Sequence, residues 1–146
     1  MKRLWLSNSA DQTQEIAASF AATLHGGQCI ALEGDLGAGK TQFVRGLVRG
    51  LGGDGRSVSS PTFILLHVYP TPKWTVYHLD AYRIGGVEDF EAIGFAELLE
   101  QGGIVVVEWA SKIETLLPLH HIRVDFRITG QDQRELTFTL PVDAGP

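Results

Sequence analysis

The sequence contains a single cysteine among its 146 residues, Cys29, so no disulfide can form within the chain. Cys29 lies in an apolar run, "CIAL", with no cationic neighbour to activate its thiol. We therefore expect a small buried hydrophobe rather than a reactive nucleophile. A chain without disulfides also fits a reducing compartment.

Long apolar stretches and runs of positive charge are absent as well. No apolar run approaches the roughly 20 residues that cross a bilayer, and the first residues lack the apolar core of a secretion signal. We expect a cytoplasmic protein with no membrane partner. The formal net charge is −5, with 12 basic and 17 acidic residues. The basic residues form no stripe along the sequence, which disfavours direct, tight binding to RNA or DNA. Membership in a complex that contains RNA remains compatible with this charge.

Strand-like and helix-like patterns alternate along the chain, and its length fits one domain, residues 1–146. A helix is expected after Ser9 as N-cap, ending at Gly26 and Gly27. The other predicted helices cover 41–51, 86–103 in two pieces broken near Gly94, and 111–118. Strands are predicted at 3–6, 28–34, 63–69, 74–80, 104–109, 121–128 and 135–142. Residues 63–80 should form one hairpin and the last two strands another. Arg45 and Arg49 are expected on the solvated side of their helix.

The most specific motif is the stretch from Gly34 to Thr41, "GDLGAGKT", which meets the spacing G-x-x-x-x-G-K-[ST]. An apolar strand pattern precedes it and an amphipathic helix pattern follows it, so a chance match in a glycine-rich turn is disfavoured. Such a loop turns successive N–H groups inward around phosphate, and its glycines permit the dihedral angles required. The following helix directs its free N–H groups at the anion. Lys40 would neutralise phosphate oxygens and Thr41 would ligate Mg²⁺.

Two acidic residues end apolar strands in the way that such a site requires. Glu108 closes "IVVVE" and Asp80 closes "TVYHLD". We assign Glu108 to the magnesium shell and Asp80 to the water or the metal, although these roles could be exchanged. Thr62, in the hydroxyl-rich loop "SSPT", is either part of a simple turn or a sensor of the terminal phosphate. The catalytic candidates are thus Lys40, Asp80, Glu108 and Thr62.

The remaining polar and aromatic residues give weaker signals. Trp109 is either a core aromatic or packs beside the phosphate site. The five histidines lack the spacing of metal ligands and are interpreted as structural or surface residues. Arg83 is a candidate arginine finger, but it could equally form a structural ion pair with Asp80 or Glu88.

Four motifs in this order, "GDLGAGKT", "SPTF", "YHLDAYR" and "VVEW", closely resemble those of the bacterial TsaE (YjeE) family. The resemblance implies a P-loop NTPase-like α/β sandwich, with a mixed, mainly parallel central sheet flanked by helices and a C-terminal antiparallel hairpin. It implies a weak Mg²⁺-dependent ATPase required for N6-threonylcarbamoyladenosine at position 37 of ANN-reading tRNAs. The implied partner is the TsaD–TsaB heterodimer, and tRNA would be reached only through that complex.

The resemblance also assigns residues to roles. It makes Thr41 and Glu108 magnesium ligands, makes Asp80 and Thr62 important for turnover, and puts the adenine near Ala10. The expected nucleotide contacts are Ala10, Gly34, Leu36, Gly37, Ala38, Gly39, Lys40 and Thr41. Two departures from the family pattern, Ala81 in "DAYR" and Gln42 after Thr41, leave these assignments in place.

Three other functions compete with this one. A small-molecule kinase would need a lid and an acceptor pocket, for which the chain has little length. A GTPase is disfavoured because no N-K-x-D motif is present to read guanine. A nucleotide-gated binding module with incidental hydrolysis would use every residue named so far, so only experiment separates it from an ATPase.

Overall fold

The computed structural model describes residues 1–59 and 65–141. Seven strands form one sheet in the order β1-β7-β6-β2-β5-β4-β3. The strands are β1 (Lys2–Ser7), β2 (Cys29–Glu33), β3 (Leu66–Tyr69), β4 (Val76–Asp80), β5 (Ile104–Glu108), β6 (Ile122–Ile128) and β7 (Arg134–Thr139). The α-helices are α1 (Ala10–Ala21), α2 (Lys40–Gly50), α3 (Glu88–Ala92) and α4 (Phe95–Leu99), and the 3₁₀ helices are η1 (Gly55–Ser57) and η2 (Ala110–Leu116).

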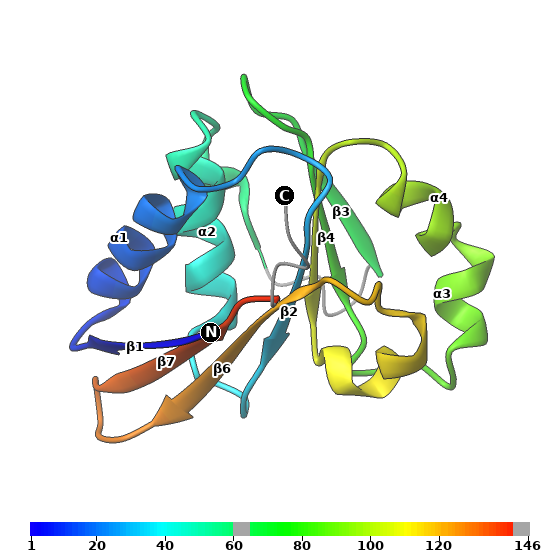
Figure 1. Ribbon diagram of the computed structural model, residues 1–146. Helices are drawn as coiled ribbons and strands as arrows, with labels where there is room; N and C mark the ends of the chain where they lie inside the picture. The colour runs from blue at the N-terminus through cyan, green and yellow to red at the C-terminus, as the bar shows by residue number, and fades with distance from the viewer. Residues whose placement is uncertain (60–64, 142–146) are drawn as a thin grey trace.

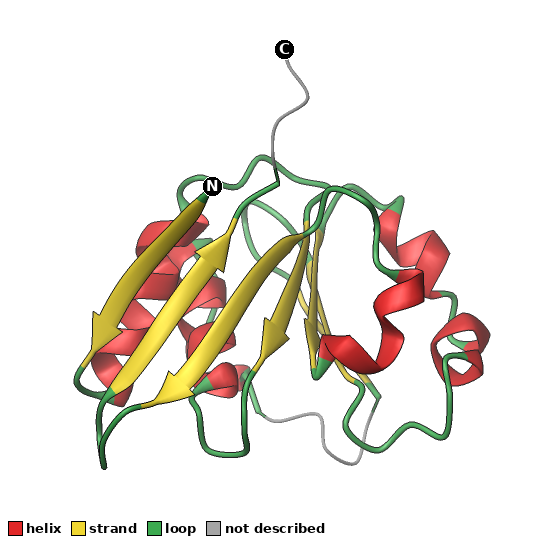
Figure 2. Cartoon of the chain, turned by 60° about the horizontal axis from the view of Figure 1, so that its bottom comes forward, coloured by secondary structure: helices red, strands yellow, loops and turns green. Residues whose placement is uncertain are grey.

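Helices cover both faces of the sheet. In Figure 1, α1 and α2 lie on one face and α3 and α4 on the other, and Figure 2 shows the twisted sheet between these layers. The central strands β6, β2, β5 and β4 run parallel, and antiparallel pairs lie at both ends of the sheet. This is the mixed α/β sandwich that the sequence predicts, including both hairpins.

Two apolar clusters follow from the alternation of side chains along the buried strands. Ile30 and Leu32 of β2 point toward α1 and α2, whereas Cys29 and Ala31 point toward α3, α4 and η2. All five residues of β5 are buried, as expected for a strand covered on both faces. Cys29 is 2% exposed, which confirms the expectation of a buried hydrophobe.

The helix boundaries partly agree with the sequence patterns. Ser9 caps α1 by accepting a hydrogen bond from the Gln12 N–H, as predicted. The helix does not continue to Gly26, because it closes in a tight turn in which the Thr23 hydroxyl donates to the Phe20 carbonyl. The break at Gly94 is confirmed, and this glycine has a left-handed φ of 81°.

The short helix predicted at 111–118 is present as a 3₁₀ helix, Ala110–Leu116, with a kink at Ile113. One detail of the prediction was wrong. Arg45 is not on the solvated side of α2, since its guanidinium is half-buried and donates to the Val58 carbonyl at 2.8 Å. Arg49 is exposed as expected. In the part of the chain that the structure describes, no helix is long and apolar enough to cross a membrane.

Candidate functional site

The glycine-rich segment forms a tight loop between the end of β2 and the start of α2. Gly37 has a φ of 80° and Gly39 a φ of 104°, left-handed values that favour glycine. Gly39 is the N-cap of α2 and has no side chain with which to cap it. The first N–H groups of this 11-residue helix therefore face the loop without a side-chain acceptor. The strand–loop–helix context expected for a phosphate-binding loop is present.

Lys40 begins α2 and turns its side chain back over the loop. Its Nζ donates to the carbonyl oxygen of Gly34 and lies 3.3 Å from that of Asp35. The ammonium also lies 3.9 Å from the centre of the Trp109 ring, within the range of a cation–π contact. Burial lowers the pKa of Lys40, and the neighbouring carboxylates, Glu108 above all, act in the opposite direction. Trp109 therefore packs beside the site, and it also packs against the apolar cluster on the other face of the sheet, so both interpretations hold.

The two predicted acids lie side by side at the carboxyl edge of the sheet. Asp80 on β4 pairs in register with Glu108 on β5. Glu108 Oε2 lies 3.4 Å from the Thr41 hydroxyl, which reaches it from the first turn of α2. Residues 67 positions apart in the sequence therefore meet at one point. Both acids are nearly inaccessible, at 8% exposed for Asp80 and 3% for Glu108.

Asp80 has a partner of its own at this edge. Its Oδ1 accepts a hydrogen bond of 2.8 Å from the Tyr82 N–H, which fixes the carboxylate relative to the turn that follows β4. Burial raises the pKa of Asp80, and the nearby charge of Glu108 acts in the same direction, while the bond from Tyr82 opposes them. A carboxyl with a raised pKa holds a proton more readily than an exposed one, as acid–base groups in active sites do.

A cavity of about 400 Å³ brings most of the candidate residues together. It is lined by Leu36, Gly37, Ala38, Gly39, Lys40, Thr41, Gln42, Asp80, Tyr82, Arg83, Glu108 and Trp109. Gly34 lies just outside this lining, at the start of the loop. Ala10 is the first residue of α1 and is exposed, and it does not line the cavity. Thr62 lies outside the described residues.

Two residues that support the site are not marked as functional by any sequence motif. His78, interpreted as structural or surface, is fully buried with its Nε2 2.6 Å from Glu108 Oε2. The signal available was its spacing: His78 and Asp80 are two apart on a strand, so they share one face of the sheet. Arg134 of β7 donates to the Gly37 carbonyl at 3.0 Å and so braces the loop. No local pattern marks Arg134, because this contact spans 97 positions.

The oxygen atoms beside the phosphate loop suit a magnesium ion that is shared with a nucleotide. Across residues 1–59 and 65–141, no three His, Cys, Asp or Glu side chains are grouped closely enough to hold a metal. Magnesium in nucleotide sites typically takes one or two protein oxygens and completes its shell with phosphate and water. The Thr41 hydroxyl and the Glu108 carboxylate, 3.4 Å apart, fit that pattern.

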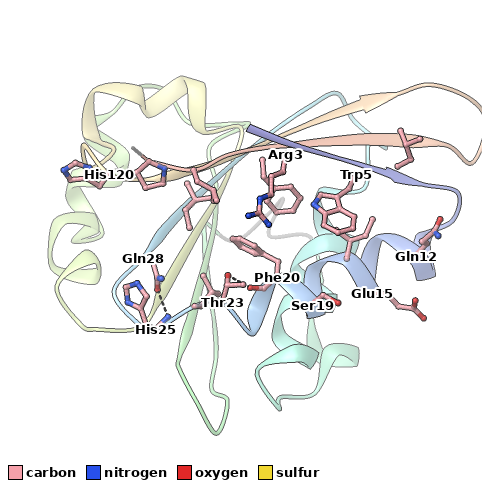
Figure 3. Close-up of a pocket in the computed structure, with 17 residues that line it drawn as sticks. Arg3, Trp5, Gln12, Glu15, Ser19, Phe20, Thr23, His25, Gln28 and His120 are labelled. Atoms are coloured by element: carbon pink, nitrogen blue, oxygen red, sulfur yellow. Dashed lines mark hydrogen bonds between the residues drawn. The ribbon is translucent and has the colours of Figure 1, made fainter. Parts of the chain in front are cut away.

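A larger cavity, of about 910 Å³, lies away from the loop, between α1 and the strands β1, β6 and β7. Figure 3 shows Arg3 and Trp5 of β1 together with Ser19 and Phe20 of α1 around this space. Its lining combines apolar side chains with scattered polar ones, and it contains none of the candidate catalytic residues. The chemistry of the phosphate loop is therefore concentrated in the smaller cavity.

Comparison with known proteins gives a consistent result. The model of the family "Threonylcarbamoyl adenosine biosynthesis protein TsaE" matches residues 7–136. A protein of Rickettsia bellii named tRNA threonylcarbamoyladenosine biosynthesis protein TsaE is 39% identical over 132 residues, 90% of this chain and 91% of its own. The Bacillus subtilis protein of the same name is 40% identical over 140 residues, 95% of this chain and 87% of its own.

A solved structure extends the likeness to the fold. The crystal structure of Bacillus subtilis YdiB superimposes with a TM-score of 0.76 at 32% sequence identity. The match covers 97% of this chain and 86% of that one. The sandwich with its central parallel strands is therefore shared along nearly the whole chain.

Proposed function

Because this chain belongs to the TsaE family of threonylcarbamoyl adenosine biosynthesis proteins, we propose that it is a Mg²⁺-dependent ATPase. In this proposal it supports the formation of N6-threonylcarbamoyladenosine at position 37 of ANN-reading tRNAs in the cytoplasm. It acts with a TsaD–TsaB heterodimer and meets tRNA only through that complex. The relatives named above carry this tRNA modification in their names.

The observation that carries the ATPase assignment is the convergence of Lys40, Thr41 and Glu108. The loop and the N-terminus of α2 bind the phosphates through backbone N–H groups. The ammonium of Lys40 moves from the carbonyls of Gly34 and Asp35 to the phosphate oxygens. Thr41 and Glu108 are the residues that would hold Mg²⁺, which neutralises charge on the triphosphate when bound. Asp80, hydrogen-bonded by Tyr82, orients the attacking water.

Slow turnover by the isolated chain follows from the charges near the phosphates. Arg83 lines the cavity, and its side chain is exposed. Without an arginine held against the terminal phosphate in the transition state, P-loop enzymes hydrolyse their nucleotide slowly. In this proposal the partner protein orders the segments beside the terminal phosphate and so supplies the missing stabilisation. The response of residues 59–62 and 80–83 to the bound nucleotide controls docking of the partner. Within residues 59–62, Thr62 is proposed as the residue that responds to the terminal phosphate.

Calorimetry with Mg·ATP tests the proposal directly. The native chain should bind Mg·ATP, and Lys40→Ala should weaken binding by about ten- to hundredfold, as expected for losing a hydrogen bond to a charged group. Lys73→Ala is the matched control, since Lys73 is exposed in the turn before β4. No measurable heat from the native chain at millimolar Mg·ATP would refute the proposal.

A second experiment separates an ATPase from a nucleotide-gated binding module. Glu108→Gln should bind Mg·ATP more weakly and, even at ATP concentrations that saturate it, lose phosphate release, and a reconstituted tRNA modification assay with the partner proteins should then stall after the first turnovers. Normal multiple-turnover modification by this variant would favour the module. Transfer of phosphate to a metabolite instead of water would favour a small-molecule kinase.

A further inference from the structure

We propose that His78 is a positioning residue that holds the Glu108 carboxylate toward Thr41, an inference that rests on the proposed ATPase function. The imidazole would thereby set the orientation of a metal-shell carboxylate without touching the nucleotide itself. Residues that orient metal-binding side chains in this way affect metal affinity strongly.

The contact between the two side chains is short and enclosed. His78 Nε2 lies 2.6 Å from Glu108 Oε2, and the two side chains are 0% and 4% exposed. An ionised carboxylate only accepts hydrogen bonds, so the proposal requires the tautomer that carries the proton on Nε2. The same Oε2 lies 3.4 Å from the Thr41 hydroxyl. The imidazole therefore holds the oxygen that faces the first turn of α2.

His78 itself is fixed on three sides. Its backbone lies on β4, opposite His67 of β3 and Val106 of β5. The Tyr69 ring packs on it with centroids 5.9 Å apart, and the Tyr69 hydroxyl is tied to the Ser59 backbone. A side chain this confined cannot follow Glu108 to another position, so it fixes the carboxylate in one rotamer.

The second ring nitrogen supports a role beyond stability. His78 Nδ1 is buried and has no hydrogen-bond partner among the described residues. A buried polar atom without a partner carries a desolvation cost that an apolar residue at this position would not have. The imidazole is therefore not the most stabilising choice for the core, and among the described residues its polar contact is with Glu108.

The deciding experiment compares two amides that mimic different ring nitrogens. In His78→Gln the amide nitrogen reaches the place of Nε2, whereas in His78→Asn it reaches only the place of Nδ1. His67→Asn is the matched control, because His67 lies directly across the β3–β4 ladder and contacts Tyr69 instead of Glu108. ATP affinity is measured by calorimetry in excess Mg²⁺ and again in chelator, after circular dichroism has verified folding.

We expect His78→Asn to lose about ten- to hundredfold in affinity with Mg²⁺ and nothing in chelator. His78→Gln and His67→Asn should stay close to the native affinity in both conditions. Equal losses with and without Mg²⁺, equal losses in the Gln and Asn variants, or no loss in either would overturn the positioning role. If the native chain itself binds no Mg·ATP, the ATPase proposal fails and this inference fails with it.

A spectroscopic readout needs no His78 variant. In protein labelled with ¹⁵N-histidine, the His78 Nε2–H resonance should shift in Glu108→Gln, which changes its acceptor. It should be unmoved in Glu15→Gln, an exposed acid on α1. An unchanged resonance in Glu108→Gln would show that Nε2 does not donate to this carboxylate, and the proposal would be withdrawn even if a His78 variant failed to fold.

Discussion

At the scale of single residues, burial decides which side chains can react. Cys29 on β2 faces the cluster covered by α3, α4 and η2, and burial raises the pKa of its thiol from an ordinary 9.0 to about 12. Only the thiolate attacks electrophiles efficiently. A shift of this size lowers the thiolate fraction near neutral pH by about a thousandfold, and the packed sheet blocks access as well.

Labelling of Cys29 should therefore report global opening of the fold. At pH 8 in native buffer, a disulfide reagent such as DTNB should react at least about a hundredfold more slowly than in guanidinium chloride, since both the thiolate fraction and access are reduced. Absorbance of the released thiolate measures the rate, and glutathione at the same pH is the control. Rapid stoichiometric labelling of the folded chain would contradict this burial.

The residues that sequence reasoning could find are those that a local pattern marks. Lys40 and Thr41 belong to a contiguous motif. Asp80 and Glu108 each end an apolar strand, and the rule that catalytic acids follow the carboxyl ends of parallel strands identified these two acids. His78 and Arg134 follow no such rule. Each matters through a partner 30 or 97 positions away, and only the register of the sheet brings those partners into contact.

At the scale of elements, the close packing of α1 on α2 depends on two glycines. Gly46 and Gly50 lie one turn apart on α2, facing Gln14 and Ala18 of α1. A Cβ atom at Gly46 would lie 2.1 Å from the Gln14 carbonyl oxygen, far inside contact distance. Because the obstacle is backbone, the helices would have to separate. The two helices also bring Gln14 and Gln42 within 2.8 Å, next to the phosphate loop.

Gly46→Ala should accordingly destabilise the fold, by about 1–3 kcal/mol from overpacking. Alanine's higher helix propensity, worth roughly 1 kcal/mol over glycine, offsets only part of the clash. Urea denaturation followed by circular dichroism measures the change in the free energy of unfolding. Glu15→Ala on the exposed side of α1 is the control and should stay within about 0.5 kcal/mol. An equal or more stable Gly46→Ala protein would show that α1 can move freely.

Most elements could be predicted from the sequence, but their pairing only in part. Hydrophobic periodicity marked residues 3–6 as a strand, and β1 does form there. Its partner is β7, with Lys2 opposite Thr139, so the strand extends the C-terminal hairpin. Nothing in the local pattern encodes this contact between the two ends of the chain. The pattern at 111–118 likewise marked a short helix without its type, and the structure has a 3₁₀ helix with a kink at Ile113.

At the scale of the whole molecule, the sheet separates two kinds of surface. The carboxyl edge of β2, β4 and β5 carries the loop, the acids and the smaller cavity. The edge strand β1 instead exposes large apolar side chains, with Leu4 at 59%, Trp5 at 50% and Leu6 at 63% exposed. Three arginines pair with carboxylates: Arg56 with Asp54, Arg123 with Asp125 and Arg127 with Glu135. These pairs reduce the positive charge available to a polyanion.

The charge distribution predicts that the isolated chain has little affinity for tRNA. Nucleic-acid binding draws its sequence-independent affinity from cations that replace counterions on phosphates, and here the net charge is −5 with several arginines already paired. In fluorescence anisotropy with labelled tRNA at about 0.15 M salt, we expect no saturable binding up to roughly 10 µM protein, the middle of the range of non-specific affinities. The same tRNA should bind once a TsaD–TsaB heterodimer is added, with the heterodimer alone as control. Micromolar binding by the chain alone that weakens steeply with salt would reveal a basic surface in the fold and would move the tRNA contact onto this subunit.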